Sequence, residues 1–437
     1  MLLYILAAIF GPIFYVGKFP LATYQLVFAG LFFVAALGAI SNRRTTIIVP
    51  GVMKLYLLLL FFYAFSAMTN LWELDYHAHP RDAVVVFAPL QYFVLVCLVA
   101  TFVARSNIDY GRLAKGYMVA NALVLALVGL ISVLQMLDLF NAQSILAEYY
   151  GKTNVETWRE YFQYNPRASA TFNLEPNTLG LFCSIAMLNL QMFARESGLP
   201  LVVSAMCYVL GLVALILSGS FTGLVVLFLV TFIYLFVYRR IGFKTTAVIS
   251  VVLFSTYFTF QPEISASLAR QKLSSEQIIP SSIKARMDNA WTKAGVAIAN
   301  EPVNGIGAGV GVLDYSADND YLDKFLRFGV LGGSAFVLWV ASLIAIPLVL
   351  RTRTRAVLPR KLFLFSSLIA LALALASVTG SAFNAPRLAE YFWMFYILPF
   401  MLLRSALKTV QATKVVNSNP MPTVAGIAAS RNASDPL

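Results

Sequence analysis

An acidic pair in the last third of the chain is the first group of residues suited to chemistry. Asp318 and Asp320 lie in Asp318-Asn319-Asp320-Tyr321-Leu322, directly before a long apolar run. Two carboxylates at this spacing supply a general base for a hydroxyl group, or oxygen ligands for a divalent cation. Short acidic pairs are common on protein surfaces, so a solvated pair is the ordinary alternative to either role.

An arginine beside small residues forms a second candidate group. Arg167 is followed by Ala168-Ser169-Ala170-Thr171 and then by a Pro176-Asn177 pair, which is expected to begin a helix. Small residues let the backbone approach a ligand closely, and a helix N-terminus favours an anion. The guanidinium group is a planar, permanently charged fork suited to phosphate. The alternative is an ordinary helix start with a solvated arginine.

Two further arginines precede apolar runs. Arg286 lies in the segment 281–291, whose pattern is typical of an amphipathic helix on a membrane surface. The glycine-rich stretch 301–311 follows it and is a turn, not a nucleotide loop, because it follows no strand and lacks a Lys-Ser/Thr ending. Arg387 lies near Glu390 at the last helix start, where the two form either a structural ion pair or, through Arg387, a ligand contact.

The elements that must position these residues are membrane helices. The chain of 437 residues is 59% hydrophobic and 12% charged, with a mean hydropathy of +0.77, whereas a soluble chain has roughly 25% charged residues. This composition excludes a secreted disulfide scaffold, a nucleic-acid-binding domain and a disordered regulator. The 3 cysteines lie in apolar runs and the 2 histidines share one short loop, so neither a disulfide framework nor a zinc site is expected.

Apolar runs of roughly 17–25 residues predict transmembrane helices. We find about twelve, near 2–17, 20–40, 52–69, 83–104, 116–138, 177–194, 199–217, 221–238, 245–261, 325–350, 361–378 and 389–404. The expected fold is therefore an all-α polytopic membrane protein, with one transmembrane domain over 1–414. The small, polar segment 415–437 is expected to be a disordered cytoplasmic tail.

The charges predict the orientation of these helices. Most of the 32 lysines and arginines lie in one set of alternate loops and in the C-terminal segment, whereas most of the 20 acidic residues lie in the other set. The positive-inside rule places the basic side, and both termini, in the cytoplasm. The opposite face carries two long segments, about 139–176 and 262–324, and loops of this length are usually functional. The net charge of +12 thus reflects topology rather than an anionic partner.

In this order, the segments resemble the O-antigen ligase/polymerase superfamily of bacterial membrane enzymes. The similar elements are Arg-x-Ser-x-Thr-Phe…Pro-Asn at 167–177, Ser-Gly-Ser-x-Thr-Gly at 218–223, Arg…Trp at 286–291, Glu-Pro…Gly-Ile-Gly at 301–307, and Asp-Asn-Asp-Tyr-Leu…Phe-Gly-Val-Leu-Gly from 318 onward. Ligases of this superfamily generally carry a histidine where this chain has Asp318-Asn319-Asp320, and Phe221 stands where an arginine is expected. The chain is more similar to the polymerase branch, usually called Wzy.

The resemblance implies a GT-C-like glycosyltransferase of the bacterial inner membrane. Such an enzyme joins undecaprenyl-pyrophosphate-linked oligosaccharide repeat units at the periplasmic face, to make O-antigen or exopolysaccharide, with no cofactor and no metal. A chain-length regulator, a flippase and membrane lipids are the expected partners, and nucleic acid is not. The runner-up is a ligase that transfers the glycan to lipid A core or to a protein. A flippase for the lipid-linked unit is the alternative from another class, and it should line a membrane-depth cavity with polar residues.

The resemblance also assigns roles to particular residues. Arg167 and Arg286 are expected to hold the pyrophosphate, and Asp318 or Asp320 is the candidate base. Further candidate contacts to pyrophosphate or glycan are Asn177, Asn319, Tyr321 and Arg387. The structural alternative is that the aspartates only brace the loop through salt bridges to Lys324 or Arg327; both roles are open for Asp318, and bracing is preferred for Asp320.

Overall fold

The computed structural model describes residues 2–16, 19–41, 47–72, 80–105, 109–151, 156, 160, 162–163, 166–173, 175–239, 284, 286–307 and 319–402. Six helices in these ranges are long and apolar enough to cross a membrane. They are α5 (Tyr110–Met136), α8 (Pro176–Ser197), α9 (Leu201–Ser218), α10 (Phe221–Phe232) with its π-helical continuation η2 (Ile233–Tyr238), α15 (Asp320–Arg353) and α16 (Val357–Ala376). A mostly helical, polytopic membrane architecture is thereby confirmed.

Shorter apolar helices overlap four more of the predicted runs. They lie within α2 (Thr23–Ser41), within α3 (Gly51–Trp72), within α4 (Pro80–Arg105), and at α17 (Leu388–Tyr396) and the residues that follow it. The predicted run at 245–261 and the predicted tail at 415–437 lie outside the described residues. The number of spans therefore stays a prediction.

The first predicted span is wrong. The described residues of this run, 2–16, form a short helix, α1 (Leu2–Phe10), and the first strand of a hairpin, in which β1 (Ile13–Val16) pairs antiparallel with β2 (Phe19–Ala22). Gly11-Pro12 ends the helix, because proline disfavours a helical conformation at the residue before it. A helix of 9 residues is about 14 Å long, well short of a hydrocarbon core about 30 Å thick.

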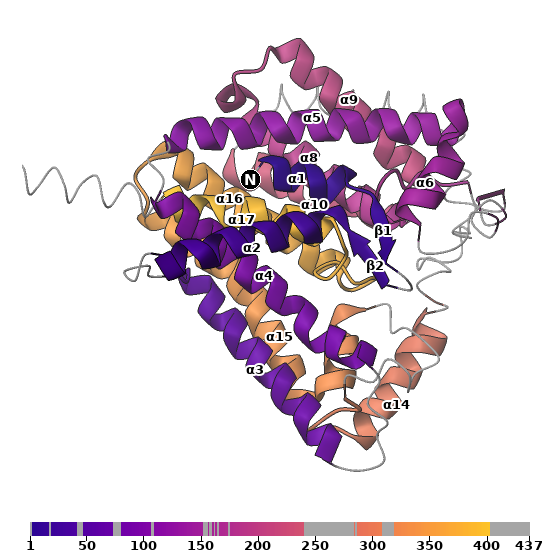
Figure 1. Ribbon diagram of the computed structural model, residues 1–437. Helices are drawn as coiled ribbons and strands as arrows, with labels where there is room; N and C mark the ends of the chain where they lie inside the picture. Colours follow the sequence, from indigo (N-terminus) through magenta and orange to yellow (C-terminus); the bar gives the residue numbers. More distant parts are fainter. Residues whose placement is uncertain are drawn as a thin grey trace, which may run out of the picture.

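The helices form two groups inclined to each other. Helix α5 packs on α8 and α9, and α8 also packs on α10 (Figure 1). The second group contains α3, α4 and α15, which run together away from α5 towards α14 (Thr292–Asn300) (Figure 1). Helix α16 contacts α15, α10 and α8, so it connects the two groups.

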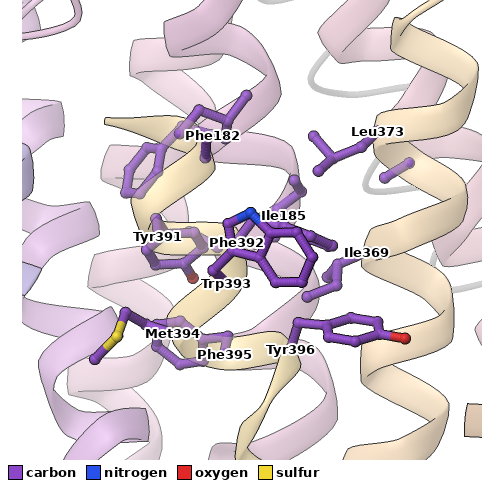
Figure 2. Packing of buried hydrophobic residues seen from close by; sticks show 14 of the residues in the cluster. Phe182, Ile185, Ile369, Leu373, Tyr391, Phe392, Trp393, Met394, Phe395 and Tyr396 are labelled. Atoms are coloured by element: carbon purple, nitrogen blue, oxygen red, sulfur yellow. The ribbon is translucent and has the colours of Figure 1, made fainter. Parts of the chain in front are cut away.

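Helix α17 is the centre of the core. All 9 of its residues are buried, including the aromatic side chains of Tyr391, Phe392 and Trp393. Figure 2 shows these side chains between α8 and α16, with Phe182 of α8 and Leu373 of α16 among their neighbours. A helix that is apolar on all sides belongs in a core, so the last predicted run is a central element of the bundle.

The two long predicted loops contain short helices. The first includes the 3-10 turn η1 (Leu139–Asn141) and α6 (Ala142–Tyr150). The second includes a π-helix, η3 (Arg286–Trp291), which leads directly into α14. The predicted amphipathic helix at 281–291 thus corresponds to a π-helical turn over its described part. Such turns are often found at functional sites.

Two of the predicted motifs, the turn 301–307 and the helix start from 318 onward, meet at a sharp kink in α15. Gly329 has φ 62° and ψ −166°, which interrupts the helix. The turn 301–307 crosses the kink: Ile306 N donates to the Leu326 carbonyl at 2.9 Å, and Val330 N donates to the Pro302 carbonyl at 2.8 Å. The turn therefore satisfies backbone groups that the kink frees, as buried polar groups require.

Replacement of Gly329 by alanine is expected to destabilise the protein by about 3 kcal/mol or more, since this backbone conformation is essentially restricted to glycine. A Cβ atom would also lie 1.9 Å from the Val303 carbonyl oxygen. The thermal unfolding midpoint of the purified protein in detergent measures the effect. Gly116→Ala is the control, because a Cβ there has no atom within 4 Å and should stabilise α5 by up to about 1 kcal/mol. Equal unfolding midpoints for the two variants would contradict the prediction.

Candidate functional site

Arg167 lies against the turn 218–223 that follows α9. Its Nε donates to the Ser218 carbonyl at 2.7 Å, and its Nη2 donates to the Gly219 carbonyl at 3.3 Å and to Asn177 Oδ1 at 2.7 Å. A positive charge is favourable beside the carbonyl groups at a helix C-terminus. Two of the predicted motifs, 167–177 and 218–223, are therefore side by side, and the partly exposed guanidinium group of Arg167 lies between them.

The small residues of this turn are required by close helix packing. A Cβ atom on Gly180 would lie 2.3 Å from Ser220 Cβ, and one on Gly223 would lie 2.7 Å from the Gly180 carbonyl carbon. Ser184 Oγ donates to the carbonyls of both glycines, at 2.8 and 2.7 Å. The turn is thus held firmly against α8, which explains the small residues without any ligand.

Arg286 is linked to the same turn indirectly, by way of the segment 377–387 between α16 and α17. Its Nη1 donates to the Thr379 carbonyl at 3.1 Å. The Thr379 hydroxyl is 3.1 Å from the hydroxyl of Thr222, within the turn 218–223. Arg286 and Arg167 therefore contact structural elements that are hydrogen-bonded to each other. Thr222 belongs to the predicted motif 218–223 but was not itself a candidate site residue. Thr379 was not predicted, and its sequence signal is a small polar residue between apolar runs.

Asp320 also binds the segment 377–387. Its Oδ2 accepts hydrogen bonds from Ser377 Oγ at 2.7 Å and from Phe383 N at 3.3 Å. Its Oδ1 is buried and has no hydrogen-bond partner among the described residues. Asn319 caps α15 by accepting from Leu322 N at 3.1 Å. The carboxylate is thus fixed through one oxygen, and the other oxygen is left unpaired.

The predicted salt bridges from Asp320 to Lys324 or Arg327 do not form. Within the described ranges, both cations bind Asp323 instead, with Lys324 Nζ and Arg327 Nε each 2.7 Å from its carboxylate. Arg327 lies one helical turn after Asp323, whereas Asp320 is turned towards Ser377. Among the described residues, the ion pairs at the start of α15 are therefore those of Asp323, and Asp320 accepts hydrogen bonds from the neutral donors Ser377 Oγ and Phe383 N.

The other predicted contacts are placed as follows. Tyr321 donates its hydroxyl to the Ala374 carbonyl at 3.0 Å, at the end of α16. Asn177 is exposed at the start of α8 and accepts from Arg167. Asp318, the other candidate base, lies outside the described residues. Three of the candidates, Arg286, Asp320 and Tyr321, thus contact the end of α16 or the segment directly after it.

The side chain of Arg387, at the end of the segment 377–387, is fully buried. Its Nη1 donates to the Ala8 and Ile9 carbonyls at 3.1 and 2.8 Å, and its Nη2 donates to the Gly11 carbonyl at 2.8 Å. Its Nε donates to Asn173 Oδ1 at 3.0 Å. Arg387 therefore caps the C-terminus of α1, where free carbonyl groups need donors.

Arg387 and Glu390 do not form the predicted ion pair. The ion pairs found among the described residues join other side chains. Glu390 instead accepts a hydrogen bond from the Tyr92 hydroxyl at 3.2 Å. Burial lowers the pKa of the Arg387 guanidinium group, and the nearby Tyr150 opposes this effect. The carbonyl groups of α1 and the Tyr150 ring, 4.9 Å away, compensate for this burial.

The candidate site thus combines two permanent positive charges, on Arg167 and Arg286, with the oriented carboxylate of Asp320. Such an arrangement can stabilise a departing phosphate group and accept a proton from a hydroxyl group. No group of three metal-ligating side chains occurs in the part of the chain that the structure describes, and a metal-free reaction stays a prediction. No known protein family matches the sequence, and no curated protein matches it either.

Proposed function

We propose that this protein is a bacterial inner-membrane polysaccharide polymerase that joins undecaprenyl-pyrophosphate-linked oligosaccharide repeat units at the periplasmic face. The observation that carries the proposal is the meeting of Arg286 and Asp320 on the segment 377–379. The turn 218–223 joins this segment to Arg167 through the hydroxyls of Thr222 and Thr379. A glycosyl transfer from a lipid pyrophosphate needs positive charge beside the departing pyrophosphate and a base beside the attacking hydroxyl group.

In the proposed reaction, a hydroxyl group of the acceptor unit attacks the anomeric carbon of the donor glycan. The bond between that carbon and the pyrophosphate oxygen breaks, and the electron pair leaves with undecaprenyl pyrophosphate. Arg167 and Arg286 stabilise the charge that develops on the leaving group. The hydroxyl proton passes to a carboxylate, either Oδ1 of Asp320 or Asp318. No nucleotide is needed, because cleavage of the bond between the glycan and the pyrophosphate supplies the driving force.

The remaining predicted residues have supporting roles in this proposal. Asn177 orients Arg167, Asn319 caps the helix that carries Asp320, and Tyr321 anchors that helix to α16. Arg387 belongs to the framework rather than to the substrate contacts, because its side chain is 0% exposed and its Nε, Nη1 and Nη2 all donate to buried acceptors.

The orientation proposed for the chain places both termini in the cytoplasm, on the basis of the charge distribution between alternate loops. The reaction then takes place on the periplasmic side, where a flippase would deliver the repeat units and a chain-length regulator would act. A ligase is the runner-up, and a flippase is the alternative from another class.

Asp320→Asn is expected to reduce chain extension by roughly 10²–10⁴-fold if Asp320 is the base. Asparagine keeps an oxygen that can accept from Ser377 and Phe383, so the unfolding midpoint should change little. The measurement is the length distribution of surface polymer in cells that carry the variant as their only copy. A polymerase defect leaves single repeats at the surface, a ligase defect leaves long chains unattached, and a flippase defect leaves no repeats outside.

The matched control is Asp288→Asn, which removes an exposed carboxylate from η3 and should preserve long chains. Full activity of Asp320→Asn would eliminate Asp320 as the base and leave Asp318 as the candidate. Loss of both stability and activity would indicate that Asp320 serves only to hold the start of α15 against the segment 377–387.

Chain extension by the purified protein is expected to be unchanged in an excess of chelator, because arginine side chains supply the positive charge. The rate of polymer formation from lipid-linked units, with and without chelator, measures this. A loss that Mg²⁺ or Mn²⁺ restores would overturn the metal-free mechanism.

A further inference from the structure

A group of arginines lies at the opposite end of α16 from the candidate site. Helix α16 ends beside the segment 377–387 and begins at Val357, and its 20 residues span about 30 Å. A short connection, residues 354–356, joins its start to the end of α15. The arginines on or beside this connection are Arg351, Arg353, Arg355 and Arg360. This part of the molecule is therefore separate from the site proposed for the reaction.

Two contacts bring further helix ends to the same place. The guanidinium carbon of Arg351 is 4.5 Å from the centroid of the Tyr238 ring, at the end of η2, and Arg239 follows directly in the chain. Lys361 Nζ is 2.6 Å from Glu196 Oε1, at the end of α8. The ends of α8, η2 and α15 thus meet the start of α16. We define the basic surface as Arg239, Arg351, Arg353, Arg355 and Arg360.

The charges of the basic surface are not balanced by carboxylates of the described residues. Four of its arginines are exposed, and none of the five forms an ion pair within the described ranges. Glu196, which lies nearby, is already paired with Lys361. The charges of Arg351 and Arg360 are also close enough to repel each other. An anion that binds between such like charges relieves their repulsion.

The start of α16 adds hydrogen-bond donors to the basic surface. Its N-cap residue, Ala356, makes no side-chain hydrogen bond, and its first turn contains no acidic residue. The first backbone N–H groups of a helix have no partner within the helix, and they favour an anion. A phosphate group beside Arg355 and Arg360 would accept hydrogen bonds from these backbone groups as well.

Exposed apolar side chains lie next to the basic surface on the same elements. Val237 precedes Tyr238 on η2, Val349 lies near the end of α15, and Val357 begins α16; all three valines are exposed in the described part of the chain. The positive-inside rule explains basic residues anywhere on this side of the membrane, but it does not require them to gather where several helix ends meet. A ligand that fits both parts has an anionic head and hydrocarbon chains.

We propose that the basic surface binds the headgroup of an anionic phospholipid, whose acyl chains lie against Val237, Val349 and Val357. Basic pockets between transmembrane helices on the cytoplasmic side suit such headgroups, and the charge distribution assigns this side to the cytoplasm. Cardiolipin, which has two phosphate groups, matches several adjacent arginines better than a lipid with one phosphate does. The bound lipid holds the four helix ends together. The proposal makes no assumption about the reaction.

The experiment measures binding of lipids to the purified, delipidated protein by native mass spectrometry. The probes are cardiolipin, phosphatidylglycerol, phosphatidylethanolamine and inorganic phosphate. We expect cardiolipin to bind most tightly, at least tenfold more tightly than phosphatidylethanolamine, and not to be displaced by an equal concentration of inorganic phosphate. Equal binding of cardiolipin and phosphatidylethanolamine, or no retained cardiolipin, would overturn the proposal. Displacement by phosphate would indicate a simple anion site and would also overturn it.

The double variant Arg355→Gln/Arg360→Gln should weaken cardiolipin binding about thirtyfold, which corresponds to about 2 kcal/mol, because each basic residue near anionic lipid contributes about 1 kcal/mol. The matched control is Lys54→Gln/Arg112→Gln. It removes the same charge from exposed positions near the starts of α3 and α5, on the same basic side. Its affinity should remain within twofold of the parent protein. Equal losses in both double variants would show a general effect of charge and would contradict a defined site.

The unfolding midpoint separates lost binding from lost folding. Without lipid, both double variants should unfold like the parent protein, because all four side chains are exposed. Cardiolipin should raise the midpoint of the parent protein and of the Lys54→Gln/Arg112→Gln control, but not that of Arg355→Gln/Arg360→Gln. An equal rise in all three proteins would refute the proposed site. A protein that binds cardiolipin in this way but extends no chains would support the lipid site and refute the polymerase proposal.

Discussion

Replacement of Arg286 by alanine is expected to abolish long polymer chains while single repeat units still reach the cell surface. Arg286 supplies a permanent charge beside the segment 377–379, where the pyrophosphate is proposed to leave. Removal of one donor that stabilises developing charge costs roughly 10²–10³ in rate. Its hydrogen bond to the Thr379 carbonyl is partly exposed, and the purified variant is therefore expected to keep an unfolding midpoint close to that of the parent protein.

Two readouts check this prediction: the length distribution of the surface polymer, and the rate of extension by the purified protein with lipid-linked units. Arg286→Lys should recover only part of the rate, because lysine keeps the charge but loses the planar fork. Lys293→Ala is the matched control, since it removes an exposed positive charge from the adjoining helix α14. Normal chain lengths in both Arg286 variants would end the proposal of a pyrophosphate clamp.

Replacement of Arg387 by alanine is expected to destabilise the whole protein, by about 3–5 kcal/mol. Its side chain is 0% exposed and donates to three carbonyls at the end of α1 and to Asn173. Alanine would leave these acceptors buried without a donor, and each such group costs about 1–3 kcal/mol. The yield of membrane-inserted protein and its thermal unfolding midpoint measure the loss.

The control for Arg387 is Arg112→Ala. Arg112 pairs with Asp109 at 3.3 Å, but its side chain is 89% exposed, and an exposed ion pair contributes about 0–1 kcal/mol. Arg387→Lys should recover part of the stability, because an ammonium group has fewer donors and another shape. An Arg387→Ala protein that unfolds like the parent but lacks activity would instead restore Arg387 as a substrate contact.

Much of the architecture follows from the sequence. Apolar composition and run length predict a polytopic helical membrane protein, and α5, α8, α9, α10, α15 and α16 lie where such runs occur. The helix breaks at Gly198 and Gly219 lie between the predicted runs 177–194, 199–217 and 221–238, and both glycines have a positive φ at a helix end. The first span fails because hydropathy does not distinguish an apolar hairpin from an apolar helix, and Gly11-Pro12 ends α1.

The candidate site was predictable in its residue types but not in its pairings. The resemblance groups Arg167 and Arg286 with either Asp318 or Asp320. The structure places Arg167, Arg286 and Asp320 around the turn 218–223 and the segment 377–387, whereas Asp318 lies outside the described residues. The salt bridges assigned to Asp320 belong to Asp323, because side-chain direction at a helix start decides which carboxylate faces the cations.

Composition and run length are enough to predict the membrane class and most helix positions, and the motifs add a short group of charged residues suited to phosphate chemistry. The contacts by which Arg387 caps α1 and Thr379 links Arg286 to Thr222 are visible in the tertiary structure alone. The physical reason is that helix formation depends on local propensity and hydrophobicity. Hydrogen-bond partners depend on which helix ends meet, and packing between segments hundreds of residues apart determines that.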